Sequence, residues 1–448
     1  MQLYHASAYD RSKLQPSWWE ASAPPLDLQL SPLEGAHQCD VAIIGGGFTG
    51  LNAALVLMRD FGLSVTVLEA GPFGWGASGR NGGFCCPGSA KLPVSTMIAR
   101  YGETETRRFH RAQRLAVDHV AQLLEAAAID ADAVERADLS LAHKPNRVDD
   151  LREEQAFARS FFGEETEFLQ REALIERGFG GPLFHAGLLG RTTFGLHPLK
   201  YLRGLARLAH GTGVHLVPFS PVQAWTRRGD AHLLRTAQGE VTAGKVLVAT
   251  NGYTQDNLLG QLAGTALPAL SRILVTRQLG QSEIAAQAWS TTVPAADTRR
   301  LLHYFRLLPD NRFLFGGRGG LDASPAGVDR GIGQLRRTFE AMFPAWADVE
   351  TEYSWSGLVC LTWPLVPFAG PVPGVDGAWA AFGWHGNGVA MGSYAGNRIA
   401  TVMAGGQALG EALPSVMTAP LKAFPFAYAR KAMLRAAYIG YSIQDEWL

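Results

Sequence analysis

The stretch 40–70 constrains the fold of this chain more than any other part of the sequence. It begins with a short β-branched apolar run, 41–44, which is typical of a buried parallel strand. Three glycines with the spacing G-x-G-x-x-G follow, and from 49 to 61 apolar side chains recur at helical intervals. A second apolar run, 65–68, comes next. The order of these segments predicts a βαβ unit with a phosphate-binding turn.

Each of the three glycines has a separate structural role. Gly45 permits the tight turn out of the strand, Gly47 lets a pyrophosphate approach without meeting a Cβ, and Gly50 lets the helix pack closely on the strand. The free N–H groups at the start of the helix then face two phosphates. Glu69 stands where a carboxylate accepts the hydroxyl protons of an adenosine ribose, which disfavours NADP because a 2′-phosphate would be repelled.

A glycine turn alone is weak evidence, because the chain has 51 glycines and an ordinary turn is the alternative. The strand before it, the helix after it and the acid at the end of the second strand together favour a dinucleotide site. This stretch does not distinguish FAD from NAD.

Composition excludes several classes of protein. A chain of 448 residues allows two or three domains with a large core, and its 40 basic residues balance 40 acidic ones, so nucleic acid is not expected as a partner. No apolar run approaches the roughly 18 residues of a membrane span, and the N-terminal segment lacks the pattern of a secretory signal. The cysteines have no C-x-x-C spacing, which predicts no metal site and favours a reducing cytoplasm; they are Cys39, Cys85, Cys86 and Cys360.

A glycine-rich segment, 70–88, follows Glu69 and has almost no periodicity. Such a segment can wind its backbone amides against a flat polar ligand, and an ordinary surface loop is the alternative. It offers amides, an amide side chain and a fixed cation through Ser78, Gly79, Arg80, Asn81, Gly82 and Gly83.

Two later turns have a similar character. A buried strand expected at 246–249 ends in Thr250, Asn251 and Gly252, which places backbone near a cofactor. Near the C-terminus, 379–404 predicts a strand, a glycine-rich turn and a helix beginning near Gly392. In that turn, bare backbone at Gly383, Gly386 and Gly388 admits a ring system, and Asn387 offers polar contacts.

Taken together, the G-x-G-x-x-G unit, SGRNGG, ATNGY and GWHGNG resemble the D-amino-acid oxidase superfamily of FAD enzymes, and within it the γ-glutamylputrescine oxidoreductase type. The resemblance spans about 15–445. It implies an α/β fold with a Rossmann-like FAD-binding domain and a second, mainly antiparallel β substrate domain of the glutathione-reductase-2 type. The implied cofactor is non-covalent FAD; a covalent link through Cys360 is disfavoured because its surroundings do not match the linkage motif.

The cofactor contacts that the motifs and the resemblance imply include a valine whose backbone meets the adenine, Val222. The full set is Gly45, Gly47, Phe48, Thr49, Gly50, Glu69, Ala70, Ser78, Gly79, Arg80, Asn81, Gly82, Gly83, Val222, Thr250, Asn251, Gly252, Gly383, His385, Gly386, Asn387, Gly388 and Val389.

The expected domain division follows the changes of pattern along the chain. Residues 1–38 form an extended arm; 39–90, 196–262 and 353–410 form the FAD-binding domain; 91–195 and 263–352 form the substrate domain with its helices; 411–448 form a helical tail. A basic, aromatic tail could rest on a membrane surface, but packing on the enzyme is favoured.

The expected reaction is FAD-dependent oxidation of the C–N bond of an amine or amino acid, with a γ-glutamylated amine among the candidates. Hydride passes to flavin N5, water hydrolyses the imine to carbonyl and amine, and O₂ becomes H₂O₂. One alternative is a dehydrogenase that passes electrons to a quinone or protein acceptor. Another is a flavin-binding module without turnover.

Four residues are the expected catalytic candidates. Arg318, at the end of an alternating strand, could hold a substrate carboxylate, whereas a surface arginine is the alternative. Tyr304 and Trp384 could form walls that disfavour a charged amine, whereas core packing is the alternative. His385 could touch the ring or substrate, although the family more often has histidine where Asn387 stands.

One absence bears on the electron acceptor. Sarcosine-oxidase-like members use a lysine of the second domain to activate oxygen, and this sequence has no lysine between Lys245 and Lys422. Either Arg318 or His385 supplies the positive charge, or the electrons pass to an acceptor other than oxygen.

Overall fold

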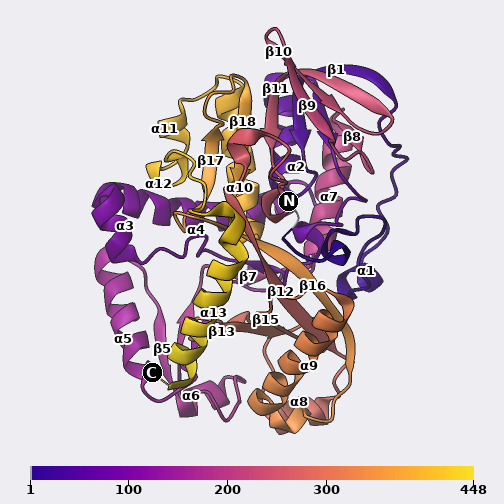
Figure 1. Ribbon diagram of the computed structural model, residues 1–448. Helices are drawn as coiled ribbons and strands as arrows, with labels where there is room; N and C mark the ends of the chain where they lie inside the picture. The colour runs from indigo at the N-terminus through magenta and orange to yellow at the C-terminus, as the bar shows by residue number, and fades with distance from the viewer. Residues whose placement is uncertain (1–2, 448) are drawn as a thin grey trace.

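The computed structural model describes residues 3–447 and builds them around two eight-stranded β-sheets (Figure 1). The path of the first sheet is β17-β18-β11-β1-β2-β8, with a hairpin of β9 and β10 on β11. Its strands are β1 (Gly35–Ile44), β2 (Val65–Leu68), β8 (His215–Val217), β9 (Ala224–Arg228), β10 (Ala231–Arg235), β11 (Gly239–Val248), β17 (Phe368–Pro371) and β18 (Ala378–Phe382).

The centre of the first sheet is parallel, as a dinucleotide-binding fold requires. β1 pairs in parallel with β2 on one side and with β11 on the other. The expected strand 41–44 is the buried end of a longer one, because 35–39 also pairs with β11. Along this buried end, Val41 and Ile43 join one core cluster and Ala42 and Ile44 join another, so both faces of the sheet are covered.

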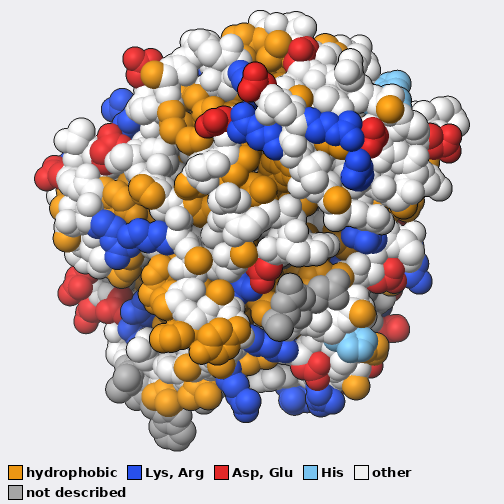
Figure 2. All heavy atoms as spheres, turned by 45° about the horizontal axis from the view of Figure 1, so that its top comes forward, with side chains coloured by type: hydrophobic (Ala, Val, Ile, Leu, Met, Phe, Trp, Pro, Cys, Tyr) orange, Lys and Arg blue, Asp and Glu red, His pale blue; other side chains and the backbone are white. Residues whose placement is uncertain are grey.

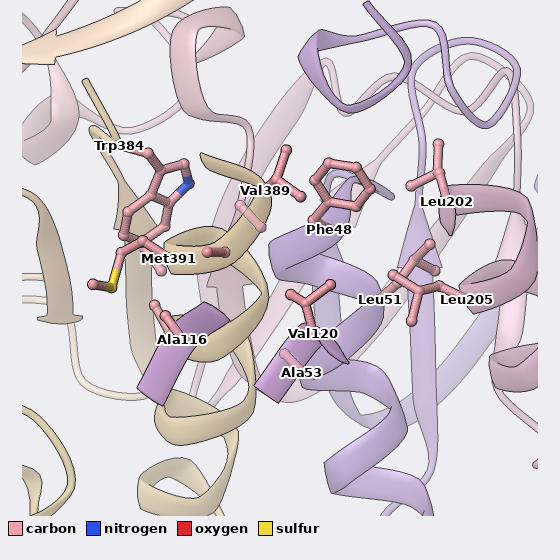
Figure 3. Close-up of a cluster of buried hydrophobic side chains, with 14 of the residues drawn as sticks. Phe48, Leu51, Ala53, Ala116, Val120, Leu202, Leu205, Trp384, Val389 and Met391 are labelled. Atoms are coloured by element: carbon pink, nitrogen blue, oxygen red, sulfur yellow. The ribbon is translucent and has the colours of Figure 1, made fainter. Parts of the chain in front are cut away.

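Four helices pack together on one side of this sheet. They are α2 (Phe48–Phe61), α4 (Glu103–Ala126), α7 (Pro198–Gly211) and α10 (Gly388–Met403). Figure 3 shows Phe48 and Leu51 of α2 between Val389 of α10 and Leu202 of α7. The backbones of α2 and α10 touch at Gly396, where any Cβ would overlap the carbonyl of Thr49. This contact places the start of α2 against the middle of α10.

The second sheet is mainly antiparallel, with the order β16-β12-β15-β14-β13-β4-β6-β5. Its aromatic core, which includes Trp289, Phe305, Phe313 and Phe343, is covered by α8 (Gln281–Gln287) and α9 (Pro325–Met342). The strands are β4 (Asp138–Leu141), β5 (Glu167–Gln170), β6 (Ala186–Gly190), β12 (Ala266–Thr276), β13 (Ala295–Asp297), β14 (His303–Leu307), β15 (Phe313–Arg318) and β16 (Thr351–Thr362). The remaining elements are β3 (Phe84–Cys85), β7 (Phe194–Gly195), α1 (Trp18–Ser22), α3 (Val94–Tyr101), α5 (Arg147–Phe157), α6 (Arg171–Glu176), α11 (Leu409–Ala412) and α12 (Ser415–Thr418).

Several expected boundaries differ from the structure. β16 pairs with β12 along its length, so 351–362 belongs to the second sheet although the expected FAD-binding domain began at 353. α10 begins at Gly388 and not near Gly392, which lies one turn inside the helix. α9 begins at Pro325, and the hydroxyl of Ser324 caps its start. Val222, the expected adenine contact, lies two residues before β9.

The N-terminal arm is anchored by aromatic side chains. Trp19 is buried, and its Nε1 donates to the carbonyl of Asn81 at 2.8 Å. Trp75 of the glycine-rich segment donates in turn to the carbonyl of Asp10. The arm therefore lies directly on the segment that was expected to bind the cofactor.

The tail ends in α13 (Arg430–Trp447), which runs along the front of the molecule in Figure 1. At its start, the buried Arg430 pairs with Asp256, and near its end the carboxylate of Asp445 accepts the backbone N–H groups of Arg300 and Leu301 at 2.7 and 2.9 Å. Both ends of α13 are thus tied to the protein. In Figure 2, basic, acidic and apolar side chains are interspersed over the visible face. Across residues 3–447, no helix has the combined length and apolar content needed to cross a membrane.

Candidate active site

A single cavity of about 460 Å³ brings the two glycine turns together. Gly47, before α2, and Gly386, before α10, both line it although they lie far apart in the sequence. The cavity continues to residues of the second sheet, among them Ser271 and Arg318. The first sheet therefore supplies one part of the site and the second sheet another.

The first turn has the backbone geometry that its glycines predict. Gly45 has a φ of +110°, a conformation that side chains with a Cβ rarely adopt. A Cβ at Gly50 would lie 2.0 Å from the carbonyl oxygen of Gly45, so this glycine allows the contact between α2 and β1. No side chain of the N-cap residue closes the start of α2, although the Ser78 hydroxyl accepts the N–H of Phe48 at 3.1 Å. The positive end of the helix faces the cavity.

Glu69 occupies the end of β2 and lines the same cavity. Its Oε2 accepts the N–H of Gly46 at 2.8 Å and its Oε1 that of Gly71 at 3.2 Å. Burial raises the pKa of Glu69, and these N–H groups and the charge of Arg11 oppose the rise. Arg11 of the N-terminal arm lines the cavity beside it, a contact that the sequence did not predict.

The glycine-rich segment contributes a buried cation. Arg80 is 6% exposed and lines the cavity, and its Nη1 lies 3.5 Å from the carbonyl of Ser356. Its Nε and Nη2 have no hydrogen-bond partner within residues 3–447. A buried guanidinium with free donors is suited to a ligand that carries negative charge.

Asn81 lines the cavity, and its side chain also bonds within the glycine-rich segment. Its Nδ2 donates to the carbonyls of Ala77 and Ser78 at 3.1 and 3.0 Å, and its Oδ1 accepts the N–H of Gly83 at 2.9 Å. The amide side chain therefore holds the loop in shape at the wall of the cavity.

The second turn opens the start of α10 to the cavity. Gly386 has a φ of +105°, and Gly388 and Val389 line the cavity at the first turn of the helix. Asn387, the N-cap residue, does not cap the helix with its side chain. Its Nδ2 donates instead to the carbonyls of Pro87 and Gly88 at 2.8 and 2.7 Å. The first N–H groups of α10 are thus left to a ligand.

His385 lies behind this turn. It is fully buried, its imidazole is absent from the cavity lining, and its Nε2 lies 3.2 Å from the hydroxyl of Thr362. Burial lowers the pKa of His385 to about 3, so the ring is neutral at neutral pH. The expectation that His385 touches the ligand or supplies positive charge does not fit this placement. Its carbonyl does act on the site, because it accepts Nη2 of Arg318 at 2.9 Å.

The other three catalytic candidates line the cavity: Tyr304, Arg318 and Trp384. The hydroxyl of Tyr304 lies 3.0 Å from that of Ser271, and Trp384 packs beside Val389 and Met391 at the start of α10 (Figure 3). Burial lowers the pKa of Arg318.

The predicted cofactor residues fall into two groups. Those lining the cavity are Gly45, Gly47, Phe48, Thr49, Glu69, Ala70, Ser78, Arg80, Asn81, Gly82, Val222, Thr250, Asn251, Gly386, Asn387, Gly388 and Val389. Those outside the lining are Gly50, Gly79, Gly83, Gly252, Gly383 and His385. At Gly79 and Gly83 a Cβ would overlap a backbone carbonyl, so these two glycines serve the packing of the loop.

The sequence also missed residues in the part of the cavity next to the second sheet. Lys91, Asp138 and Leu302 line it, from three separate segments. None belongs to a motif, and only the three-dimensional arrangement brings them together. Lys91 lies shortly after SGRNGG in the sequence, and this position could have identified it as a residue of the site.

Comparison with known proteins agrees with this geometry. The family model described as "FAD dependent oxidoreductase" matches residues 40–402. "Probable oxidoreductase OrdL" of Rhizobium meliloti (strain 1021) is 34% identical over 437 residues, covering 96% of this chain and 97% of the relative. "Gamma-glutamylputrescine oxidoreductase" of Escherichia coli (strain K12) is 30% identical over 394 residues, covering 87% and 89%. The solved glycine oxidase of Geobacillus kaustophilus superposes with a TM-score of 0.67 at 21% identity, covering 83% of this chain and 96% of the other, which supports the fold.

Proposed function

Because the chain belongs to the DAO family of FAD-dependent oxidoreductases, which act on amines or amino acids, we propose that it oxidises a carboxylate-bearing amine and that O₂ is the electron acceptor. The products would be an imine, which water hydrolyses to carbonyl and amine, and H₂O₂. The observation that carries the proposal is the single cavity, which joins both glycine turns to Arg318.

The residues of the cavity fit FAD. Two helix starts without side-chain caps, those of α2 and α10, open into it, and each favours negative charge. Glu69 would accept the ribose hydroxyls, and Arg80 offers unpaired donors to negative charge. When bound, FAD supplies the two-electron acceptor for oxidation of the C–H bond next to nitrogen.

Arg318 is suited to hold a substrate carboxylate. The carbonyl of His385 fixes its Nη2, while the rest of the guanidinium faces the cavity. Tyr304 and Trp384 form apolar walls beside it, which disfavour a charged ammonium group and so favour the neutral amine. Together these residues would orient an amine that also carries a carboxylate.

The proposed substrate is a γ-glutamylated amine. A γ-glutamyl group carries a carboxylate for Arg318 at one end, and the amine to be oxidised stands at the other. The similarity to the γ-glutamylputrescine oxidoreductase of Escherichia coli supports this choice. All four cysteines are free thiols, which supports a reducing compartment such as the cytoplasm as the site of action.

One observation favours a second candidate, a dehydrogenase with a quinone or protein acceptor. Of the two residues expected to supply a positive charge for oxygen, His385 is neutral and lies outside the cavity. Arg318, the other of these two residues, is already assigned to the substrate carboxylate.

A substrate panel scored by bleaching of the bound flavin tests the proposal. The panel contains γ-glutamylputrescine, putrescine, glycine and sarcosine, each without oxygen, and H₂O₂ is then measured under air. We expect γ-glutamylputrescine to bleach the flavin at the lowest concentration and to yield one H₂O₂ per turnover. In Arg318→Met, KM should rise for γ-glutamylputrescine but not for putrescine, which has no carboxylate. Bleaching without H₂O₂ would favour the dehydrogenase, and a flavin that no amine bleaches would contradict both.

A further inference from the structure

The end of the C-terminal tail, 421–445, carries apolar side chains that the enzyme leaves exposed. Of the eleven large apolar side chains that are exposed among residues 3–445, five belong to it: Phe426, Tyr428, Ile439, Tyr441 and Ile443. Single exposed apolar side chains are ordinary on a protein surface, whereas a cluster of them marks a binding surface. None of the five lines the cavity, so the proposed function does not account for them.

Helix α13 has two apolar faces. One of them packs on the enzyme, because Leu434 is buried among residues of β12. On the opposite face the helical period aligns four apolar residues, which are Ala432, Ala436, Ile439 and Ile443. All four are exposed, Ile439 to 56% and Ile443 to 50%. In Figure 1, α13 lies at the front of the molecule. The outer stripe therefore lacks the cover that the inner face has.

Two aromatic side chains stand just before α13. Phe426 is 71% exposed and Tyr428 is 78% exposed, and their ring centroids lie 6.3 Å apart. Phe426 has a φ of +51°, in the left-handed region that side chains with a Cβ rarely adopt. Surrounding contacts normally hold a residue in such a conformation, but this ring is largely outside the packing of the described residues. A partner that covers both rings would supply the missing contacts.

The charge of this segment is positive. From 421 to 444 the sequence has no aspartate or glutamate, and it has four basic residues: Lys422, Arg430, Lys431 and Arg435. Lys422 and Arg435 are exposed. Two carboxylates that lie beside the segment are already paired, Asp256 with the buried Arg430 and Asp322 with Arg330. The exposed basic side chains are therefore suited to a partner with negative charge.

We propose that the outer face of the tail docks on an anionic lipid surface. This face, the tail surface, consists of Lys422, Phe426, Tyr428, Arg435, Ile439 and Ile443. The apolar side chains would enter the boundary between headgroups and acyl chains, and the basic ones would meet lipid phosphates. A second copy of the chain fits less well, because a two-fold contact sets the same face against itself and so brings like charges together. The tail surface is separate from the cavity and does not depend on the proposed reaction.

Sedimentation with vesicles tests the proposal on the full chain. The vesicles are made of phosphatidylcholine, either pure or mixed with phosphatidylglycerol, and the protein in the pellet is measured on a gel. We expect binding to the mixed vesicles and little to the pure ones. Binding should weaken when salt rises from about 0.1 M to about 0.5 M, because salt screens the attraction. No binding, or equal binding to both kinds of vesicle, would overturn the proposal.

Variants of the exposed side chains locate the surface. Ile439→Ser combined with Ile443→Ser should weaken binding at least about tenfold, because both side chains lose most of their apolar area. Arg435→Gln should weaken it about fivefold, the contribution expected of one basic residue near an anionic surface. The control is Leu115→Ser on α4, an exposed leucine outside the tail, which should bind as wild type does. Urea midpoints show that each variant folds, and wild-type binding in the double variant would contradict the proposal.

A second readout needs no substitution. Chymotrypsin cuts after exposed aromatic residues, so mixed vesicles should protect the bonds after Phe426 and Tyr428 and leave the bond after the exposed Phe219 unprotected. Light scattering without lipid then separates a lipid surface from a second copy, and we expect the same mass for wild type and the double variant. Unprotected bonds in the tail, or a wild-type dimer that the double variant converts to monomers, would overturn the proposal.

Discussion

Gly50→Ala is expected to separate α2 from β1 and to weaken FAD binding. The added Cβ would lie 2.0 Å from the carbonyl oxygen of Gly45, whereas ordinary van der Waals contact begins at 3.4 Å. The start of the helix must therefore move by about 1.4 Å. Both partners of this contact are backbone, so no side-chain rotation relieves it.

The cost can be estimated from studies of overpacked cores. Overpacking costs typically about 1–3 kcal/mol, and a contact that only a backbone shift relieves should lie near about 3 kcal/mol. The shift moves the N–H groups of α2 away from the phosphates. If half or more of that cost appears in binding, FAD affinity falls between about tenfold and about 100-fold, at about 1.4 kcal/mol per factor of ten.

The assay is titration of the apoprotein with FAD, followed by quenching of flavin fluorescence, together with a urea midpoint. Gly211→Ala is the matched control: it lies at the end of α7, and a Cβ added there would have no other atom within 4 Å. It should bind FAD as wild type does. Wild-type affinity and stability in Gly50→Ala would refute the argument from close packing.

Two further predictions concern Arg80 and His197. Arg80→Met should raise the Kd for FAD at least about tenfold, because hydrogen bonds to charged groups contribute about 1.5–3 kcal/mol, while Arg80→Lys should lose less; equal affinities in an FAD titration would contradict this. Burial lowers the pKa of His197 to about 3, from about 6.5 in the unfolded chain. The unfolded state therefore binds the extra proton first, and stability falls as the pH drops below about 6.5. In urea titrations at pH 7 and 5, wild type should lose about 2 kcal/mol more than His197→Asn, which keeps an acceptor at the start of α7; equal losses would contradict the shift.

The sequence predicted the first βαβ unit closely, because its signals are local. β2 has the bounds that the apolar run 65–68 implied, and α2 begins one residue before its predicted start. Glycine spacing, apolar periodicity and the terminal acid all lie within this one stretch. The cofactor and the family required three further motifs as well, SGRNGG, ATNGY and GWHGNG.

Features that depend on distant contacts were not predictable in this way. The alternating pattern of β16 identifies a strand, but only its pairing with β12 assigns it to the second sheet. The direction of His385 depends on the turn and on Asn387, which donates hydrogen bonds to a segment about 300 residues earlier.

A crystal structure of the protein purified with its flavin tests the central claim most directly. The claim is that one FAD spans both glycine turns of the single cavity. The account predicts density for the diphosphate against Gly47 and the start of α2, and for the flavin ring against Gly386 and the start of α10. Density for the ring away from Gly386, or a diphosphate bound elsewhere than at Gly47, would contradict it.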